Sequence, residues 1–129
     1  MLTTQAPDGL RLSAKVRQLY RQGKIGEALD AHYEDLVRWK TTGRSGEIQG
    51  REIDVVLHDA FMQTKRSYSA LEKPHNFLNP NIRRQIKETI RMAHASGRRA
   101  EFWFKYGVHA RVRKYREDKG GIVTLGLGE

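Results

Sequence analysis

The fold is constrained most by two strand-like segments that lie close together in the middle of the chain. Residues Glu52–Leu57 and Ala60–Lys65 are rich in apolar, strand-forming side chains, and only His58 and Asp59 separate them. So short a connection joins antiparallel strands, and the two segments are therefore expected to form a hairpin. The connection lacks an Asn-Gly or Asp-Gly turn signal, which leaves the length of the loop open.

The hairpin would bring polar side chains together at its centre. Because side chains alternate along a strand, the first strand is expected to direct Glu52, Asp54 and Val56 to one face and Ile53, Val55 and Leu57 to the other. If His58 and Asp59 form the loop, Asp54 lies opposite Gln63, with Cβ atoms roughly 5 Å apart. Lys65 shares a face with Gln63 and lies one pleat further along.

A carboxylate, an amide and an amine in this arrangement suit a metal-dependent hydrolase. The oxygens of Asp54 and Gln63 could bind Mg²⁺ or Mn²⁺, which lowers the pKa of a bound water and neutralises charge on a phosphate. Lys65 could orient or deprotonate that water. A solvent-facing polar strand with Lys65 at an edge gives the same pattern, so spacing alone does not decide between an active site and a polar surface.

Helices and further strands are expected on both sides of the hairpin. Their order predicts an α/β fold, in which a mixed sheet is flanked by helices and preceded by an N-terminal helical segment. The length of 129 residues suits one compact domain, with residues 1–24 as lead-in and short helix and residues 25–129 as the main unit. The expected elements are a loose lead-in at residues 1–9, helices from Ser13 to Tyr20, Gly26 to Lys40, Pro80 to Ala95 after an Asn79 cap and Val108 to Glu117, strands at Glu101–Lys105 and Ile122–Leu125, and irregular segments at Gly43–Gly50 and Ser67–Leu78.

Positive charge is concentrated in the C-terminal part of the chain. The sequence has 24 Lys and Arg against 15 Asp and Glu, a net charge of +9, and residues 83–119 alone hold twelve basic and four acidic residues. Such a surface attracts polyanions, nucleic acid first and an anionic membrane second, although a merely solvated charged face is the alternative. The chain has no cysteine, which excludes disulfides and thiolate chemistry. Its longest apolar runs are too short for a membrane span, so no membrane insertion is expected.

Several basic and aromatic residues are candidates for contacts with nucleic acid. On the helix that begins at Pro80, three cations form a row away from the apolar face, suited to phosphates. Phe102 and Phe104 are assigned to the core, whereas Trp103 and Tyr106 could stack on a base. The full set of candidate contacts is Arg66, Arg84, Lys87, Arg91, Trp103, Lys105 and His109.

The strand pair resembles that of the PD-(D/E)XK, or restriction-endonuclease-like, nucleases. The resemblance is carried by Gly50–Val56 and by Gln63-Thr64-Lys65, where that superfamily has an Asp on one strand and Glu-X-Lys on the next. Gln63 stands in the usual Glu position, a variant that the VRR-type nucleases also show, and it removes one ligand charge. Residues Gly26–Tyr33 are similar to the first helix of the superfamily, where a Glu joins the metal site.

The resemblance implies a complete active site. Glu27 would be the third metal ligand, and Glu47 and Glu52 are the alternatives. The presence of Glu27 in the first turn of its helix is explained equally well by a favourable interaction with the helix dipole. The implied catalytic residues are Glu27, Asp54, Gln63 and Lys65, of which Glu27, Asp54 and Gln63 would bind Mg²⁺ or Mn²⁺.

A longer stretch, from Arg51 to the C-terminus, is similar to the toxin tips of the contact-dependent growth inhibition proteins (CdiA). It includes residues 63–68, 83–91 and 100–109. The similarity implies a nuclease domain that is delivered from a secreted or cell-surface protein into the cytoplasm of a neighbouring bacterium, cleaves tRNA there, and is neutralised by a small acidic immunity protein. A DNA-cleaving nuclease of the same fold and a non-catalytic basic nucleic-acid-binding module are the alternatives.

Overall fold

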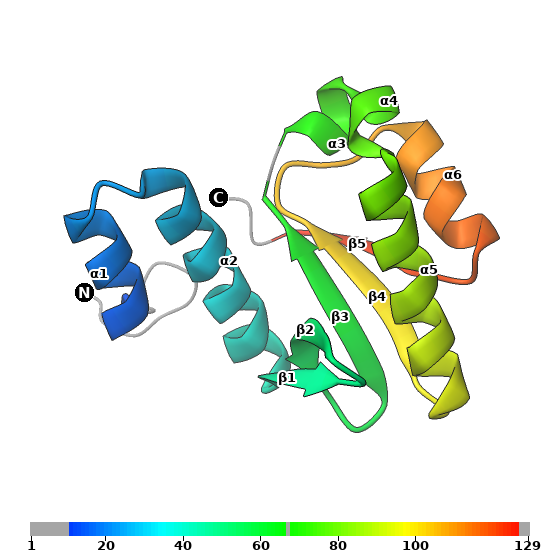
Figure 1. The fold of residues 1–129 in the computed structure, drawn as a ribbon, viewed down its shortest axis with the longest axis horizontal. Coiled ribbons are helices and arrows are strands. Elements are labelled where there is room, and N and C mark those ends of the chain that lie inside the picture. Colours follow the sequence, from blue (N-terminus) through cyan, green and yellow to red (C-terminus); the bar gives the residue numbers. More distant parts are fainter. Residues whose placement is uncertain (1–10, 67, 127–129) are drawn as a thin grey trace.

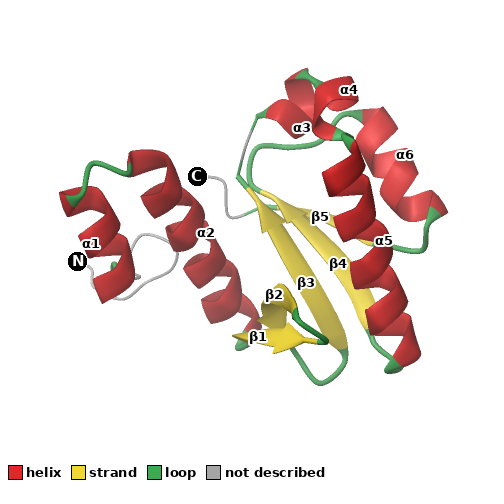
Figure 2. Ribbon diagram, viewed as in Figure 1, coloured by secondary structure: helices red, strands yellow, loops and turns green. Residues whose placement is uncertain are grey.

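The computed structural model describes residues 11–66 and 68–126, and in this part of the chain one mixed sheet is flanked by helices (Figures 1 and 2). The strands β1, β2 and β3 are antiparallel neighbours, whereas β3, β4 and β5 are parallel neighbours, in the order β1-β2-β3-β4-β5. The expected α/β fold with a mixed sheet is therefore confirmed. The strands are β1 (Arg44–Ile48), β2 (Arg51–Val56), β3 (Ala60–Lys65), β4 (Arg99–Phe104) and β5 (Ile122–Leu125).

Local sequence signals fix several of the helices. The Ser13 hydroxyl accepts a hydrogen bond from Val16 N at 3.1 Å and begins the first helix, and the Asn79 side chain accepts one from Ile82 N at 3.0 Å. Pro80 then occupies the first helical position, where no N–H is needed. The helices are α1 (Ala14–Arg21), α2 (Ile25–Thr41), α3 (Ser69–Glu72), α4 (Pro74–Phe77), α5 (Pro80–Ala95) and α6 (Ala110–Asp118).

Two segments that were expected to be irregular contain regular secondary structure. Gly43–Gly50 contains β1, which joins β2 through a turn in which Gln49 and Gly50 both have positive φ, as a two-residue hairpin turn requires. Within Ser67–Leu78, the helices α3 and α4 bury Ala70 and Phe77 in the core. Both expectations of irregular structure were wrong, because contacts with the sheet order these segments. The loose lead-in expected at residues 1–9 lies outside the described residues.

The two faces of the sheet are covered by different helices. Helices α3 to α6 cover one face over a large apolar cluster, and α2 covers the other, with α1 packed outside α2 (Figure 1). We call these the α5 face and the α2 face. The cluster on the α5 face includes Ile53, Phe61, Ile86, Phe102 and Phe104, and the smaller cluster on the α2 face consists of Tyr33, Val37, Val55, Ala60 and Met62.

Strand β2 is irregular at Asp54. Val55 and Leu57 pack on the α2 face, but Ile53 packs on the α5 face together with Val56. The expectation that Ile53 shares a face with Val55 was therefore wrong. The pairing of β1 with β2 also shifts register in this region, and a local irregularity of this kind turns a side chain to a different face.

Candidate active site

Asp54 lies where the backbone pairing between β2 and β3 gives way to side-chain hydrogen bonds. The ladder pairs Val55 with Met62, and Leu57 N donates to Ala60 O at 2.8 Å, in the register that places Asp54 opposite Gln63. At Asp54 the carboxylate takes the place of a backbone acceptor: its Oδ2 accepts from Thr64 N at 2.8 Å and from Thr64 Oγ1 at 3.1 Å. The position of the Asp54 carboxylate is thus fixed by the next strand.

The Gln63 side chain on β3 likewise takes the place of backbone hydrogen bonds to β2. Its Nε2 donates to Glu52 O at 3.3 Å, and its Oε1 lies 3.4 Å from Asp54 N. Nε2 also lies 3.2 Å from the hydroxyl of Thr89 on α5, and both Gln63 and Thr89 are buried. The amide that was expected to bind a metal therefore joins β2, β3 and α5.

Helix α2 places a row of charged residues against this part of the sheet. Asp30, Glu34 and Arg38 follow one another at helical spacing on α2. Arg38 Nη1 donates to the backbone oxygen of Asp54 at 2.8 Å and lies 3.4 Å from Glu34 Oε1. Further along the row, Asp30 Oδ1 accepts from Arg66 Nε at 2.8 Å. Glu34 is the carboxylate of α2 that is electrostatically coupled to Asp54.

Two hollows meet at Asp54. The first, of about 220 Å³, which we call the Lys65 hollow, is lined by Asp30, Tyr33, Glu34, Asp54, Thr64, Lys65, Arg66 and Gln85. The second, of about 400 Å³, which we call the Gln63 hollow, is lined by Gln49, Gly50, Arg51, Glu52, Asp54, Gln63, Gln85, Glu88, Arg91 and Met92. Asp54 and Gln85 line both, so the two hollows adjoin each other at these two residues.

Burial shifts the proton affinities of the three central groups. Burial raises the pKa of Glu34 to about 7, with a further contribution from the Asp54 carboxylate. Burial also raises the pKa of Asp54, against the hydrogen bonds from Thr64 and the charge of Lys65. The pKa of Lys65 is lowered by burial, and Arg116 lowers it further while Asp54 opposes the shift. Each group is thus displaced toward its neutral form, the behaviour expected of functional sites.

Glu27 does not lie with these groups. It is exposed and lines neither hollow, whereas Glu34 stands seven residues later on the same face of α2, about 10 Å further along the axis. Of the two alternatives, Glu52 lines the Gln63 hollow and raises the pKa of Asp54, and Glu47 is exposed on β1. The sequence shows that Glu27, Asp30 and Glu34 share a helical spacing. It does not show which of these acids lies where the helix meets β2.

The donor set suits a hard cation that keeps part of its water shell. Within residues 11–66 and 68–126, no three carboxylate or imidazole side chains converge into a closed metal cage. Mg²⁺, however, is commonly held by one or two carboxylates together with waters and substrate phosphates. Asp54 offers Oδ1, which accepts no hydrogen bond from the described residues, and Glu34 adds a carboxylate that a nearby cation would ionise. These residues therefore fit Mg²⁺ or Mn²⁺.

The candidate nucleic-acid contacts fall into two groups. Arg66 lines the Lys65 hollow, and Arg91 lines the Gln63 hollow, where its Nη2 pairs with Glu88 at 2.8 Å. Arg84 and Lys87 line a separate groove of about 570 Å³ beside Tyr115 of α6. Arg84, Lys87 and Arg91 thus lie on α5, whereas Arg66 is paired with Asp30 of α2.

The remaining candidates are placed differently from one another. Trp103 packs against the cluster of the α2 face and donates from Nε1 to Glu101 Oε1 at 3.2 Å. His109 is the N-cap of α6, where its Nδ1 accepts from Arg111 N at 3.0 Å. The Lys105 amine lies 5.2 Å from the centre of the Tyr106 ring. The structure thus packs Trp103 against the apolar cluster of the α2 face and gives His109 a capping role.

Comparison with known proteins gives one match. Residues 21–126 match a family described as restriction endonuclease fold toxin 3. The match covers helices α2 to α6 and all five strands of the described sheet, and with them every residue that lines the two hollows at Asp54. Neither a curated protein nor a solved structure matches the chain significantly. No helix among the described residues is long and apolar enough to span a membrane.

Proposed function

The chain belongs to the restriction endonuclease fold toxin 3 family, and from this we propose that it is a metal-dependent endonuclease toxin whose active site is centred on Asp54 and Lys65. One observation carries the proposal: a half-buried carboxylate, a lysine of lowered pKa and a second acid of raised pKa line the same hollow. Because perturbed acids and bases cluster where chemistry takes place, this hollow is the best-supported active site.

We assign the metal to Asp54 and Glu34. A bound Mg²⁺ or Mn²⁺ would neutralise charge on the phosphate and lower the pKa of a water. Asp54 is positioned for this by its two hydrogen bonds from Thr64, and Glu34 by Arg38. Gln63 serves as the positioning residue that holds β2 against β3 and α5. The geometry thus favours Glu34 over Glu27 and Glu47 as the second carboxylate.

Lys65 is proposed to handle the proton and the developing charge. Burial lowers its pKa, so a larger fraction of the amine is neutral and able to accept a proton from the attacking water. Once protonated, it can stabilise the negative charge that develops on the phosphate. Arg66 in the same hollow is placed to hold a neighbouring phosphate.

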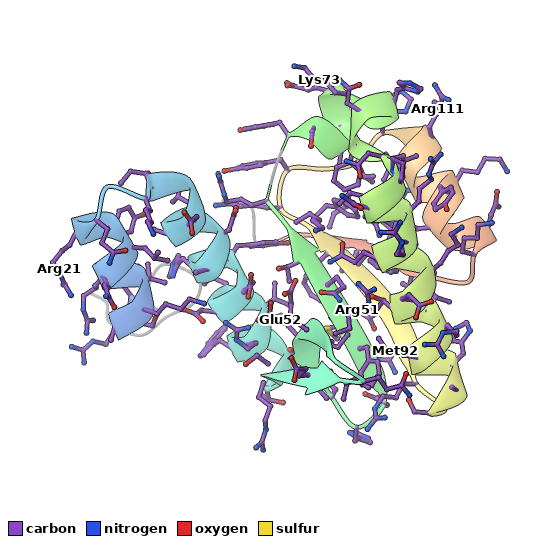
Figure 3. All side chains as sticks on the ribbon, in the orientation of Figure 1. Arg21, Arg51, Glu52, Lys73, Met92 and Arg111 are labelled. Atoms are coloured by element: carbon purple, nitrogen blue, oxygen red, sulfur yellow. The ribbon has the colours of Figure 1, made fainter. Side chains whose placement is uncertain are left out.

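The proposed substrate is nucleic acid, with tRNA preferred and DNA as the alternative. A net charge of +9 and the cations that line the groove beside α5 support a polyanion. A second, larger groove of about 650 Å³ shares Pro80, Arg83 and Tyr115 with the first and adds Arg111 and Lys114. Figure 3 shows Arg111 and Lys73 at the same end of the molecule. A continuous basic track therefore runs along α5 toward α6.

The proposal extends to a partner and a route. A toxin nuclease endangers the cell that makes it, so we propose a small acidic immunity protein that covers the basic track, and delivery of the domain to the cytoplasm of a neighbouring cell. Opposite charges on the two proteins would make association fast and sensitive to salt.

Incubation of the purified protein with total tRNA and with plasmid, with Mg²⁺ and with excess chelator, tests the activity. We expect tRNA to be cut at one preferred position in Mg²⁺ only, and plasmid to stay intact at the same protein concentration. Plasmid degradation with intact tRNA would reverse the substrate assignment. Cleavage in chelator would exclude the metal mechanism. If neither tRNA nor plasmid is cut, and the protein still binds RNA through Arg84 and Lys87, the protein is a binding module.

A further inference from the structure

Two tyrosines stack on each other beside the Lys65 hollow. The rings of Tyr68 and Tyr106 are 4.1 Å apart at their centres and inclined by only 7°. Tyr68 nevertheless has 51% of its surface exposed. Since Tyr106 covers one face of the Tyr68 ring, the exposed surface is mainly the opposite face and the edge. The pair thus presents a flat aromatic surface to solvent.

This surface is adjacent to the proposed active site. Strands β3 and β4 pair Lys65 with Phe104, and Lys105 N donates to Lys65 O at 3.0 Å. Tyr68 follows Lys65 by three residues, a span of at most about 11 Å. We call Tyr68 and Tyr106 the tyrosine platform.

Cations surround the platform. The Arg66 side chain, which lines the Lys65 hollow, interacts electrostatically with the Tyr106 hydroxyl, and the Lys105 amine lies over the Tyr106 ring at 5.2 Å. An exposed aromatic ring whose stacked partner carries two neighbouring cations matches the two parts of a nucleotide, because a base stacks on rings while its phosphates pair with cations. An apolar peptide would use the ring but not the charges.

We propose that the exposed face of Tyr68 binds an unpaired base of the substrate next to the phosphate that is cut. Arg66 and Lys105 hold the phosphates that flank that base. This rests on the proposed nuclease function and narrows its substrate to unpaired segments, such as the loops and ends of tRNA, because a paired base is already stacked inside its duplex. Tyr106 acts from beneath Tyr68, and Trp103, which packs against the apolar cluster of Tyr33, Val37, Val55, Ala60 and Met62, takes no part.

The test measures binding without cleavage. The Asp54→Asn protein, kept free of metal by chelator, is titrated into a single-stranded RNA oligonucleotide that contains the fluorescent base 2-aminopurine, and fluorescence and affinity are recorded. Stacking quenches the probe, so we expect quenching on binding. Adding Tyr68→Ala should abolish the quenching and weaken binding about tenfold, within the range known for base stacking. Adding Tyr68→Phe should preserve both, because the ring remains.

Two controls make the result specific. Trp39 is an aromatic residue of α2 that is 46% exposed and lines neither hollow, so Trp39→Ala should change nothing. A duplex RNA should be bound with equal affinity by Asp54→Asn with and without Tyr68→Ala, because its bases are not free to stack.

The outcomes separate this proposal from the nuclease function. Equal loss of affinity for duplex and single strand, or quenching that persists in Tyr68→Ala, would overturn the platform even if the wild-type protein cleaves RNA. Quenching that depends on Tyr68, in a protein whose wild type cuts no nucleic acid, would support the platform as a binding site and refute the nuclease.

Discussion

Helix α5 covers its face of the sheet with apolar side chains, whereas α2 covers the other face partly with charged ones. On the α5 face, Ile86, Ile90 and Ala93 pack on the phenylalanines of β3 and β4. On the α2 face, Tyr33 and Val37 form a smaller cluster, and the charged row of Asp30, Glu34 and Arg38 runs toward Asp54 and Arg66.

This difference separates stability from chemistry. Apolar burial contributes to folding roughly in proportion to area, while buried charges must be compensated by partners and shift their pKa values where compensation is incomplete. The α5 face therefore supplies a rigid support, and α2 supplies charged partners to the strand of Asp54 and to Arg66. Gln63 connects the two, because it ties the Asp54 strand to α5.

The largest expected effects come from two neighbours on β2 that serve different faces. Asp54→Asn should lower the cleavage rate on the order of 10³-fold with little change in thermal midpoint, because the amide keeps an oxygen for Thr64 but loses the charge. Ile53→Ala should lower the free energy of unfolding by about 2–5 kcal/mol, because Ile53 is fully buried on the α5 face. Kinetics and thermal denaturation of both variants check this. If Asp54→Asn unfolds the domain, Asp54 is structural and the comparison fails.

Gln63 tests the connection between the faces. Gln63→Glu restores the usual acid of the PD-(D/E)XK motif, but a carboxylate cannot donate to Glu52 O, and it adds a buried charge. We expect a loss of about 1–3 kcal/mol in the free energy of unfolding, measured with urea, and no gain in activity. Thr89→Val, which removes only the partner on α5, serves as the milder control. A Glu variant that is stable and more active would show that position 63 is a metal ligand.

Glu34 gives the α2 face a distinctive pH dependence. Its usual pKa of 4.5 is raised to about 7 in the folded protein, so the folded state holds more protons than the unfolded state between these values. Stability of the metal-free protein should therefore fall as pH rises from 4.5 to 7 and level off above. The expected change is about 1–2 kcal/mol, reduced because the Glu34 side chain is 30% exposed beside Arg38.

Denaturant titrations at several pH values in chelator measure this effect, with Glu34→Gln as the comparison. The variant should lose most of the slope in this window and be the more stable protein above pH 7. An identical slope in both proteins would assign the titration to another group.

Arg116 is the exception on the apolar face. It is fully buried, its three nitrogens have no hydrogen-bond partner among the described residues, and its guanidinium lies 4.2 Å from the centre of the Phe102 ring and 4.9 Å from that of Phe104. Burial lowers its pKa to about 9, and its charge in turn lowers the pKa of Lys65. The apolar cluster on the α5 face is therefore coupled by charge to the Lys65 hollow.

The Arg116→Met variant tests the effect of the Arg116 charge on Lys65. Removing a buried charge without a paired anion is expected to leave the thermal midpoint unchanged or raise it slightly. The pH profile of cleavage should move to higher pH, because Lys65 no longer experiences the repulsion. Phe102→Leu removes one aromatic ring beside Arg116 but keeps the Arg116 charge, so it should leave the pH profile of cleavage unchanged. A profile that does not move in Arg116→Met would show that Arg116 and the Lys65 hollow act independently.

Sequence reasoning succeeded where the signals are local. The hairpin register at Asp54 and Gln63 follows from a two-residue connection, and helix α5 follows from Asn79 and Pro80. Strand β1 was missed because Arg-Ser-Gly-Glu-Ile has no strand pattern and is held by pairing with β2. The proposed role of Glu34 was not predicted, because the choice among acids on α2 depends on where that helix crosses β2, which is a tertiary contact. The Ile53 side chain points to the α5 face because of a strand irregularity that no residue in this segment predicts.

The smallest expected effect concerns a surface that belongs to neither face, the outer side of α5. Arg84 and Lys87 are exposed and line the groove beside α6, so each adds one phosphate contact at most. The double variant Arg84→Ala with Lys87→Ala should weaken tRNA binding a few-fold and reduce the slope of log affinity against log salt by about 2, with the maximal rate preserved. The matched control is Arg21→Ala with Lys24→Ala, two exposed cations, of which Figure 3 shows Arg21 on α1, beyond α2 from the sheet. The control should change neither quantity.

The acidic immunity protein is proposed to cover the same basic track. The double variant at Arg84 and Lys87, the α5 pair, should therefore also slow its association and make that association less sensitive to salt. The control variant at Arg21 and Lys24 should not. If the α5 pair weakens tRNA alone, the inhibitor must bind elsewhere, and the Lys65 hollow on the side of α2 becomes its expected site.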